Sequence, residues 1–147
     1  MTEAEAAAPS LFSLIIAGRI PARFVWQDPD VVAFLDIRPF SPGHTLVVPR
    51  LEIDQWLDAP ADLLGKVTAV AQTIGLAQRE AFQAPRAALM VAGFDVPHLH
   101  IHVFPAETME TILSLSSARP ASDADLDSAA DRLREALRSL GHGRYVP

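Results

Sequence analysis

Five short runs of β-branched, aromatic and other apolar residues, bounded by Pro, Gly or Asp, divide the first two thirds of the chain. Runs of this length and composition are typical of β-strands. They predict strands over residues 22–27, 31–37, 44–48, 87–92 and 99–104. The first two are separated by Asp28-Pro29-Asp30, which has the residue types of a tight turn, so they form a predicted hairpin.

Three further segments have the spacing of apolar residues that a helix needs to cover a core. Ser10 is a typical N-cap and Gly18 a typical end for a short first helix. A long helix is predicted from about residue 60 to residue 84, and a last one from 123 to 140, with acids at its start and bases at its end. The sequence therefore predicts an α+β fold built on an antiparallel sheet.

Composition narrows the class of protein further. The chain has 147 residues, half of them apolar, which suits one globular domain, and it has no apolar run of about 20 residues for a membrane span. Residues 1–9 are alanine-rich and acidic, which predicts a flexible tail, and their lack of a basic residue argues against a secretion signal and for the cytoplasm. A net charge of −6 argues against nucleic acid as a partner.

The histidines are the feature with most chemical content. There is no cysteine, so thiol nucleophiles and thiolate metal sites are excluded. Of five histidines, three fall at alternate positions, His98, His100 and His102. On a strand they would share one face about 6–7 Å apart, while the residues between them face the core.

Three interpretations fit such a row of imidazoles. It can be a solvated strand face with incidental histidines. It can bind zinc through two of the three histidines and a third ligand from another strand, for which His44 is the candidate. It can attack a phosphate ester, because a neutral imidazole is a nucleophile near pH 7 and neighbouring imidazoles can stabilise phosphoryl oxygens.

Four stretches resemble the histidine triad (HIT) family in order and spacing. They are Val96-Pro-His-Leu-His-Ile-His-Val-Phe-Pro105, Leu11-Phe-Ser-Leu-Ile-Ile-Ala-Gly-Arg-Ile-Pro, Val32-Ala-Phe-Leu-Asp-Ile, and Pro42-Gly-His-Thr-Leu-Val-Val-Pro-Arg. The first resembles the family's signature, and the others resemble its opening helix, its ribose-binding strand and the strand before its long helix. The resemblance implies a HIT domain over residues 10–105, followed by a C-terminal extension, 106–147.

The resemblance implies a HIT-like fold, a five-stranded antiparallel sheet that dimerises into ten strands, and a purine nucleotide as substrate. It implies hydrolysis or transfer at the α-phosphate through a nucleotidyl-histidine intermediate. His100 matches the nucleophile, His102 the residue that contacts the α-phosphate, and His98 the one that orients His100. His44 matches a supporting histidine, which leaves open whether it is structural or contacts substrate.

The same resemblance assigns the nucleotide pocket. Asp36 and Ile37 match the positions that hold the ribose and pack near the base, and an ionised Asp36 would otherwise be a plain turn residue. Phe12, Ile15 and Phe34 match the apolar base pocket, although their spacing alone favours core residues.

The chain departs from the family in the loop before the triad. Gly93 can stand for a family glycine, but Phe94 and Asp95 occupy the places of a glutamine and a serine or threonine that donate hydrogen bonds to the phosphate. A carboxylate cannot donate unless protonated. Asp95 therefore either acts as a proton donor or repels ordinary nucleotides and selects another leaving group.

Other departures concern cofactors and activity. Ser10 and Ser13 stand where zinc-bearing relatives carry two cysteines, so no metal and no other cofactor is expected, apart from Mg²⁺ that a polyphosphate substrate can carry. His142 and Tyr145 are candidates for a C-terminal tail that reaches the active site of the partner subunit. The alternative is a frayed tail on the surface. The competing function is a nucleotide-binding scaffold or regulatory module with little turnover.

Overall fold

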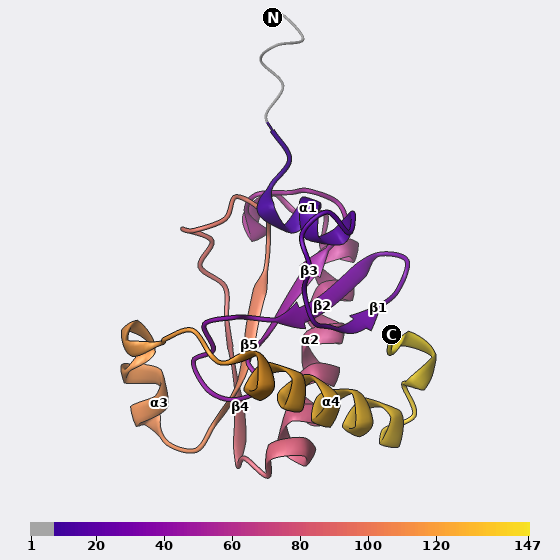
Figure 1. The fold of residues 1–147 in the computed structure, drawn as a ribbon. Coiled ribbons are helices and arrows are strands. Elements are labelled where there is room, and N and C mark those ends of the chain that lie inside the picture. The colour runs from indigo at the N-terminus through magenta and orange to yellow at the C-terminus, as the bar shows by residue number, and fades with distance from the viewer. Residues whose placement is uncertain (1–7) are drawn as a thin grey trace, which may run out of the picture.

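A five-stranded antiparallel sheet lies at the centre of the computed structural model, which describes residues 8–147 (Figure 1). The strands are β1 (Phe24–Gln27), β2 (Val31–Leu35), β3 (Thr45–Pro49), β4 (Arg86–Met90) and β5 (Ile101–Ala106). Their order is β1-β2-β3-β5-β4, and each neighbouring pair is antiparallel. The sheet and the hairpin β1–β2 confirm the predicted fold class.

Four α-helices accompany the sheet. They are α1 (Leu11–Ile16), α2 (Ala61–Phe82), α3 (Met109–Leu113) and α4 (Asp123–Ser139). Single 3-10 turns lie at Trp56–Asp58, Leu115–Ser117 and Gly143–Tyr145. Helices α1, α2 and α4 match the predictions, whereas α3 and the 3-10 turns were not predicted because segments this short carry no helical period.

Helices cover both faces of the sheet, which explains why β2 and β3 are buried along their whole length. Alternate residues of β2 belong to two apolar clusters: Ala33 packs with α2 and α4, and Phe34 packs with α1. In β5, Ile101 and Val103 join the α2 side. The side chain of His102 therefore faces the α1 side of the sheet, where the candidate site lies.

Local hydrogen bonds fix the ends of the elements as predicted. The Ser10 hydroxyl accepts from the Ser13 amide at 3.0 Å and caps α1, and Gly18 follows the helix with a φ of +78°. In the hairpin turn, the Asp28 carboxylate accepts from the amides of Asp30 and Val31, each at 2.8 Å.

The last strand differs from the prediction at both ends. It begins at Ile101, so of the three triad histidines only His102 is a strand residue, and the predicted start at Leu99 is wrong. It also runs through Pro105, which was expected to end it. Beyond Val103 the strand pairs with β4 alone, so a proline here lies at an edge.

The C-terminal segment belongs to the same core as the sheet. Leu126, Leu133 and Leu137 of α4 are buried in the cluster that α2 forms with the strands. After α4, Tyr145 stacks on Trp26 of β1, with ring centroids 4.7 Å apart, and His142 lies beside the same ring at 5.6 Å. Both candidate tail residues thus pack on their own chain.

No helix within residues 8–147 is long and apolar enough to cross a membrane. The cytoplasmic location and the exclusion of nucleic acid stay predictions. Most of the predicted N-terminal tail, residues 1–7, lies outside the described residues.

Candidate active site

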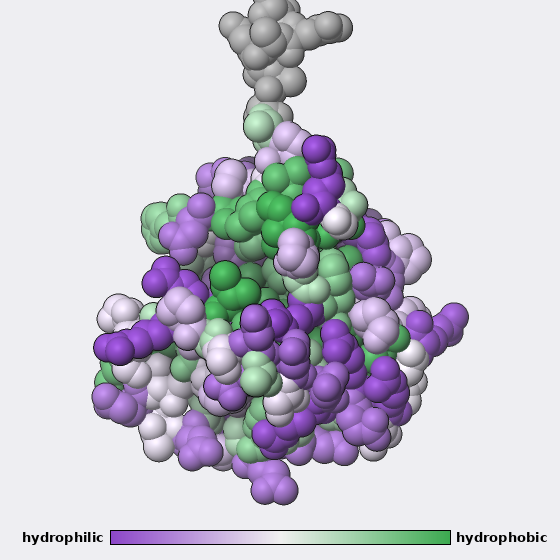
Figure 2. Space-filling view, viewed as in Figure 1, coloured by the Kyte–Doolittle hydropathy of each residue, from purple (hydrophilic) through white to green (hydrophobic). Residues whose placement is uncertain are grey.

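A cavity of about 780 Å³ opens on the α1 side of the sheet and brings together most of the predicted site residues. Those that line it are Phe12, Ile15, Phe34, Asp36, Ile37, Asp95, His100 and His102. His44, His98 and Gly93 are not among the lining residues. Figure 2 shows apolar surface on this side, between α1 and α4, bordered by hydrophilic residues.

His100 has one ring nitrogen committed to the main chain. Its Nδ1 lies 2.7 Å from the carbonyl oxygen of His98, which can only accept, so Nδ1 carries a hydrogen. In a neutral ring the lone pair is then on Nε2. The ring is almost fully buried against the edge of Phe12, with centroids 4.9 Å apart. The main chain therefore fixes the hydrogen of a neutral His100 on Nδ1 and leaves the lone pair on Nε2.

The hydrogen of His102 is fixed on Nε2, the opposite nitrogen from that of His100, by the Phe40 amide and His44. The Phe40 amide donates to His44 Nδ1 at 3.1 Å, so a neutral His44 carries its hydrogen on Nε2. That Nε2 lies 2.9 Å from Nδ1 of His102 and donates to it. His102 then carries its own hydrogen on Nε2. Its ring lies 4.9 Å from that of His100, so the cavity holds a lone pair and an N–H donor side by side.

Burial keeps these rings neutral. Desolvation, followed by the effect of the neighbouring histidines, lowers the pKa of His44 to about 3 and that of His102 to about 4. Burial also lowers the pKa of His98. The hydrogen positions derived above for His44 and His102 consequently hold at pH 7.

Asp36 follows β2 and faces the same cavity. Its Oδ1 accepts from the Arg38 amide at 2.9 Å, and its Oδ2 lies 3.9 Å from Nε2 of His44. Burial raises the pKa of Asp36, and the negative charge of Asp95 acts in the same direction. Asp36 is therefore held at the cavity wall by the main chain, with a second carboxylate oxygen available to a ligand.

The apolar wall serves the core and the cavity together. Phe12 and Phe34 are buried and meet edge to face at 5.5 Å, yet both also line the cavity. Ile37, in contrast, is 62% exposed at the cavity mouth. The two phenylalanines thus belong to the core and also line the cavity, and their role in binding a base stays a prediction.

The loop before the triad places a carboxylate at the cavity. Asp95 is exposed and lines the same space as His100 and His102, and its charge raises the pKa of His102 against the larger effect of burial. The neighbouring Phe94 is 96% exposed. Gly93 has a φ of +82°, so its contribution in this loop is a backbone conformation that other residues rarely adopt.

Metal binding at the histidines would compete with their hydrogen bonds. One potential ligand atom from each of Asp36, His44 and His102 lies within 4.8 Å of the others. A metal on Nε2 of His44 would move the ring's hydrogen to Nδ1, where it would face the Phe40 amide, a second donor. An opposed donor pair of this kind costs about 1–3 kcal/mol. His44 thus approaches His102 as a hydrogen-bond donor, rather than as a partner ligand for zinc.

The serines in place of the cysteines of zinc-bearing relatives also have other partners. Ser10 Oγ lies 2.7 Å from Nδ1 of His98, and Ser13 Oγ donates to Glu52 at 2.7 Å. Neutral hydroxyls are not among the usual ligands of structural zinc. This donor set does not fit that metal.

Sequence reasoning missed several residues around the cavity. Phe40 acts through one amide hydrogen bond to the ring of His44, and Glu52 accepts two hydrogen bonds from residues near the start of the chain. Neither arrangement leaves a periodic signal in a sequence. The start of α4 forms one wall, where Arg23 pairs with Asp123 at 3.0 Å and with Asp127 at 2.7 Å. The one available signal was the acidic first turn of α4, which fits any helix start.

The buried neutral histidines predict how stability depends on pH. In the unfolded state His44 and His102 have a pKa near 6.5, whereas in the folded state their pKa values are about 3 and about 4. The unfolded state therefore binds more protons than the folded state between these pH values. We expect the free energy of unfolding to fall as pH drops from 7 to 5, by at most about 1.4 kcal/mol per unit for each ring. Urea unfolding at several pH values should show a shallower slope for His44→Gln. Equal slopes in the two proteins would contradict the burial of a neutral His44.

Comparisons with known proteins agree with this geometry. Residues 17–109 match the model of the HIT domain family. The chain is 34% identical over 134 residues to an uncharacterised HIT-like protein of Mycobacterium tuberculosis, covering 88% of this chain and 93% of that one. It is 32% identical over 113 residues to the purine nucleoside phosphoramidase of Escherichia coli, covering 71% and 93%. The crystal structure of a zinc-bound histidine triad family protein from Mycobacterium smegmatis matches with a TM-score of 0.79 and 32% identity, over 90% and 96% of the two chains. With its triad at this cavity, the chain belongs to the histidine triad (HIT) family.

Proposed function

We propose that this protein is a HIT-type hydrolase or transferase that acts at the α-phosphate of a purine nucleotide conjugate. The observation that carries the proposal is the pairing of a nucleophilic Nε2 on His100 with an N–H donor on His102 in one cavity. The similarity to a purine nucleoside phosphoramidase supports a phosphoramidate among the substrates, beside dinucleoside polyphosphates and acyl-nucleotides.

The proposed reaction has two displacements at phosphorus. In the first, the Nε2 lone pair of His100 forms a bond to the α-phosphorus, and the bond from phosphorus to the leaving group breaks with its electron pair. The ring keeps its Nδ1 hydrogen, bonded to the His98 carbonyl, and so becomes cationic. In the second, a water molecule attacks phosphorus and gives up one proton to the solvent, the P–N bond breaks, and its electron pair returns to Nε2. A different acceptor in place of water gives transfer.

His102 acts in this scheme as a hydrogen-bond donor to the phosphoryl and leaving-group oxygens. It cannot easily release its proton, because its Nδ1 already accepts from His44 and loss of the Nε2 hydrogen would leave an anionic ring. The proton that the leaving group needs comes from water. The N–H of His102 then stabilises charge as it develops, which is commonly the largest contribution to such reactions.

Asp36 and the apolar wall account for the nucleoside. A carboxylate that accepts from two neighbouring hydroxyls is the usual means of holding a ribose, and Oδ2 of Asp36 is placed for it. Phe12, Ile15 and Phe34 offer apolar contacts to a purine, and the exposed Ile37 lines the same cavity. No cofactor is needed for these steps, and Mg²⁺ would enter only with a polyphosphate.

The first test is trapping of the intermediate. We expect His100→Asn to lose at least about 10³-fold in kcat with an adenosine phosphoramidate, because it removes the attacking lone pair. Wild-type protein quenched during turnover should carry a nucleotidyl group on His100, stable to base and labile to acid, in a peptide digest read by mass spectrometry. His142→Asn, outside the cavity, is the control. A His100→Asn variant as active as wild type would refute the mechanism, and tight nucleotide binding without turnover in wild type would favour the scaffold function.

The second test concerns Asp95. We propose that its charge disfavours anionic leaving groups, since at contact distance one like charge costs about 1 kcal/mol or more. Asp95→Ser should therefore raise kcat/KM for a dinucleoside polyphosphate about fivefold. For a cationic amine conjugate, kcat/KM should stay nearly unchanged or decrease. A loss of kcat on both substrates would instead identify Asp95 as a proton donor.

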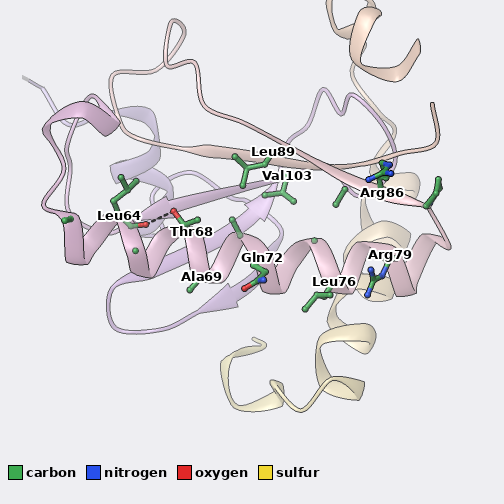
Figure 3. A pocket seen from close by; sticks show the side chains of 15 residues that line it. Leu64, Thr68, Ala69, Gln72, Leu76, Arg79, Arg86, Leu89 and Val103 are labelled. Carbon is green, nitrogen blue, oxygen red and sulfur yellow. Dashed lines mark hydrogen bonds between the residues drawn. The ribbon is translucent and has the colours of Figure 1, made fainter. Parts of the chain in front are cut away.

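The third test concerns the partner. Strand β4 is an edge strand of the sheet in the described residues, and a groove of about 1000 Å³ lies between it and α2 (Figure 3). Leu76 and Leu89, at 41% and 54% exposure, line this groove. An exposed edge with apolar side chains favours pairing with another chain. We propose that a second copy pairs β4 to β4 and extends the sheet to ten strands.

Light scattering coupled to gel filtration should give about twice the chain mass of 15.9 kDa. We expect Leu89→Glu to yield the monomer, because it places a charge in the apolar groove. Leu113→Glu alters another exposed leucine, on α3, and should leave the dimer intact. A monomeric wild type, or a dimeric Leu89→Glu variant, would argue against this interface.

A further inference from the structure

A cluster of polar side chains holds His98 in place behind the cavity, and we call Ser10, Ser13, Glu52 and His98 the His98 anchor. His98 is fully buried, with Nε2 at 2.8 Å from the carbonyl oxygen of Pro49 and Nδ1 at 2.7 Å from Ser10 Oγ. One oxygen of Glu52 accepts from the Ser10 amide and from the Ser13 hydroxyl, both at 2.7 Å. The anchor joins residues that lie as much as 88 positions apart.

Every hydrogen in the anchor has one consistent direction. Since the Pro49 carbonyl can only accept, His98 carries its hydrogen on Nε2, and its Nδ1 accepts from the Ser10 hydroxyl. That hydroxyl oxygen in turn accepts from the Ser13 amide at 3.0 Å. The bonds from Ser10 and Ser13 lower the pKa of Glu52, so the carboxylate is ionised at neutral pH. Ser13 Oγ also lies 3.5 Å from Nδ1 of His98, but its hydrogen is directed to Glu52 at the shorter distance of 2.7 Å.

The anchor connects to the proposed nucleophile through the main chain. The carbonyl of His98 accepts from Nδ1 of His100, and the adjacent amide of Leu99 donates to the carbonyl of Ile53 at 2.6 Å. The ring of His98 and the main chain of Ile53 thus hold the segment of residues 98–99 from two sides. A shift of this segment would move the one carbonyl that decides which nitrogen of His100 has the lone pair.

The anchor also places the helix that touches His100. Ser10 caps α1 and Ser13 lies in its first turn, and Phe12 between them presses its edge on both His98 and His100, at 5.9 and 4.9 Å. Glu52 reaches α1 from the segment after β3. One exposed carboxylate therefore ties the cavity wall and the triad together.

We propose that Ser10 and Glu52 are positioning residues for His100: through the ring of His98 they fix the carbonyl that keeps the Nε2 lone pair of His100 directed to the substrate. The catalytic consequence rests on the proposed function, whereas the fixed hydrogen positions do not. The proposal assigns a catalytic effect to a surface glutamate that contacts neither cavity nor substrate.

The test compares Ser10→Ala and Glu52→Ala with two matched changes. Glu52→Gln keeps an oxygen that accepts the same two hydrogen bonds. Ser122→Ala removes the N-cap of α4, whose hydroxyl accepts from Asp125 at 3.1 Å, and so imposes an equal loss of capping away from the anchor. We expect Ser10→Ala and Glu52→Ala to lower kcat about 10-fold to 100-fold with KM changed less than about threefold, because a displaced supporting bond misaligns the attacking group. Glu52→Gln should retain most of kcat.

A second readout needs no turnover. In ¹⁵N spectra of the imidazoles, wild type should show His98 as the Nε2–H form and His100 as the Nδ1–H form at pH 7. Ser10→Ala should shift the Nδ1 resonance of His98, which loses its donor, and weaken the Nδ1–H signal of His100 as the His98 carbonyl moves. Unchanged spectra in Ser10→Ala, or a kcat loss that Ser122→Ala reproduces at equal loss of Tm, would overturn the proposal. If wild type proves inactive, the proposed function fails while the spectra still decide the role of the anchor.

Discussion

Two main-chain groups decide the chemistry of this site, the carbonyl of His98 and the amide of Phe40. Each binds one ring nitrogen and so fixes where the hydrogen sits on a neutral imidazole. The carbonyl gives His100 a lone pair on Nε2, and the amide, acting through His44, gives His102 an N–H at the same position. Burial is essential to this arrangement, because a protonated ring would carry hydrogen on both nitrogens and the distinction between donor and nucleophile would vanish.

The sheet makes such burial compatible with access to substrate. Strands β2, β3 and β5 are covered by α2 and α4 on one face, so their backbone is held rigidly by a continuous apolar core. The other face is only partly covered, by the short helix α1, and the cavity opens beside it. The burial of His44 follows from this geometry. His44 lies directly before β3, and the ring of Phe40 stacks on its ring with the centroids 4.3 Å apart.

The sequence was sufficient to predict the elements that have a periodic pattern of apolar residues. Strands and long helices have periods that a run of residues displays, and Ser10, Gly18 and Asp28 mark ends by local bonds. It was insufficient where one residue acts alone. Alternation at His98, His100 and His102 suggested one regular strand, yet the strand starts only at Ile101 because the ring of His98 is engaged by Ser10 and Pro49. Glu52 and Phe40 could not be predicted, since the two bonds to Glu52 cross the fold and the Phe40 bond comes from a main-chain amide, which any residue other than proline at that position would supply.

The wall formed by α4 shows which forces shape the rest of the cavity. Asp123 and Asp127 pair with Arg23 there, but both aspartates are largely exposed, and ion pairs of that kind contribute about 0–1 kcal/mol each. Leu126, Leu133 and Leu137 of the same helix are buried, and each contributes about 1.5–3 kcal/mol. The apolar face of α4 therefore holds the helix against the core. The ion pairs mainly determine the charge of the cavity wall at α4. Helix α4 lies beyond residues 17–109, so this wall of the cavity is built by a segment outside the part of the chain that matches the HIT domain family.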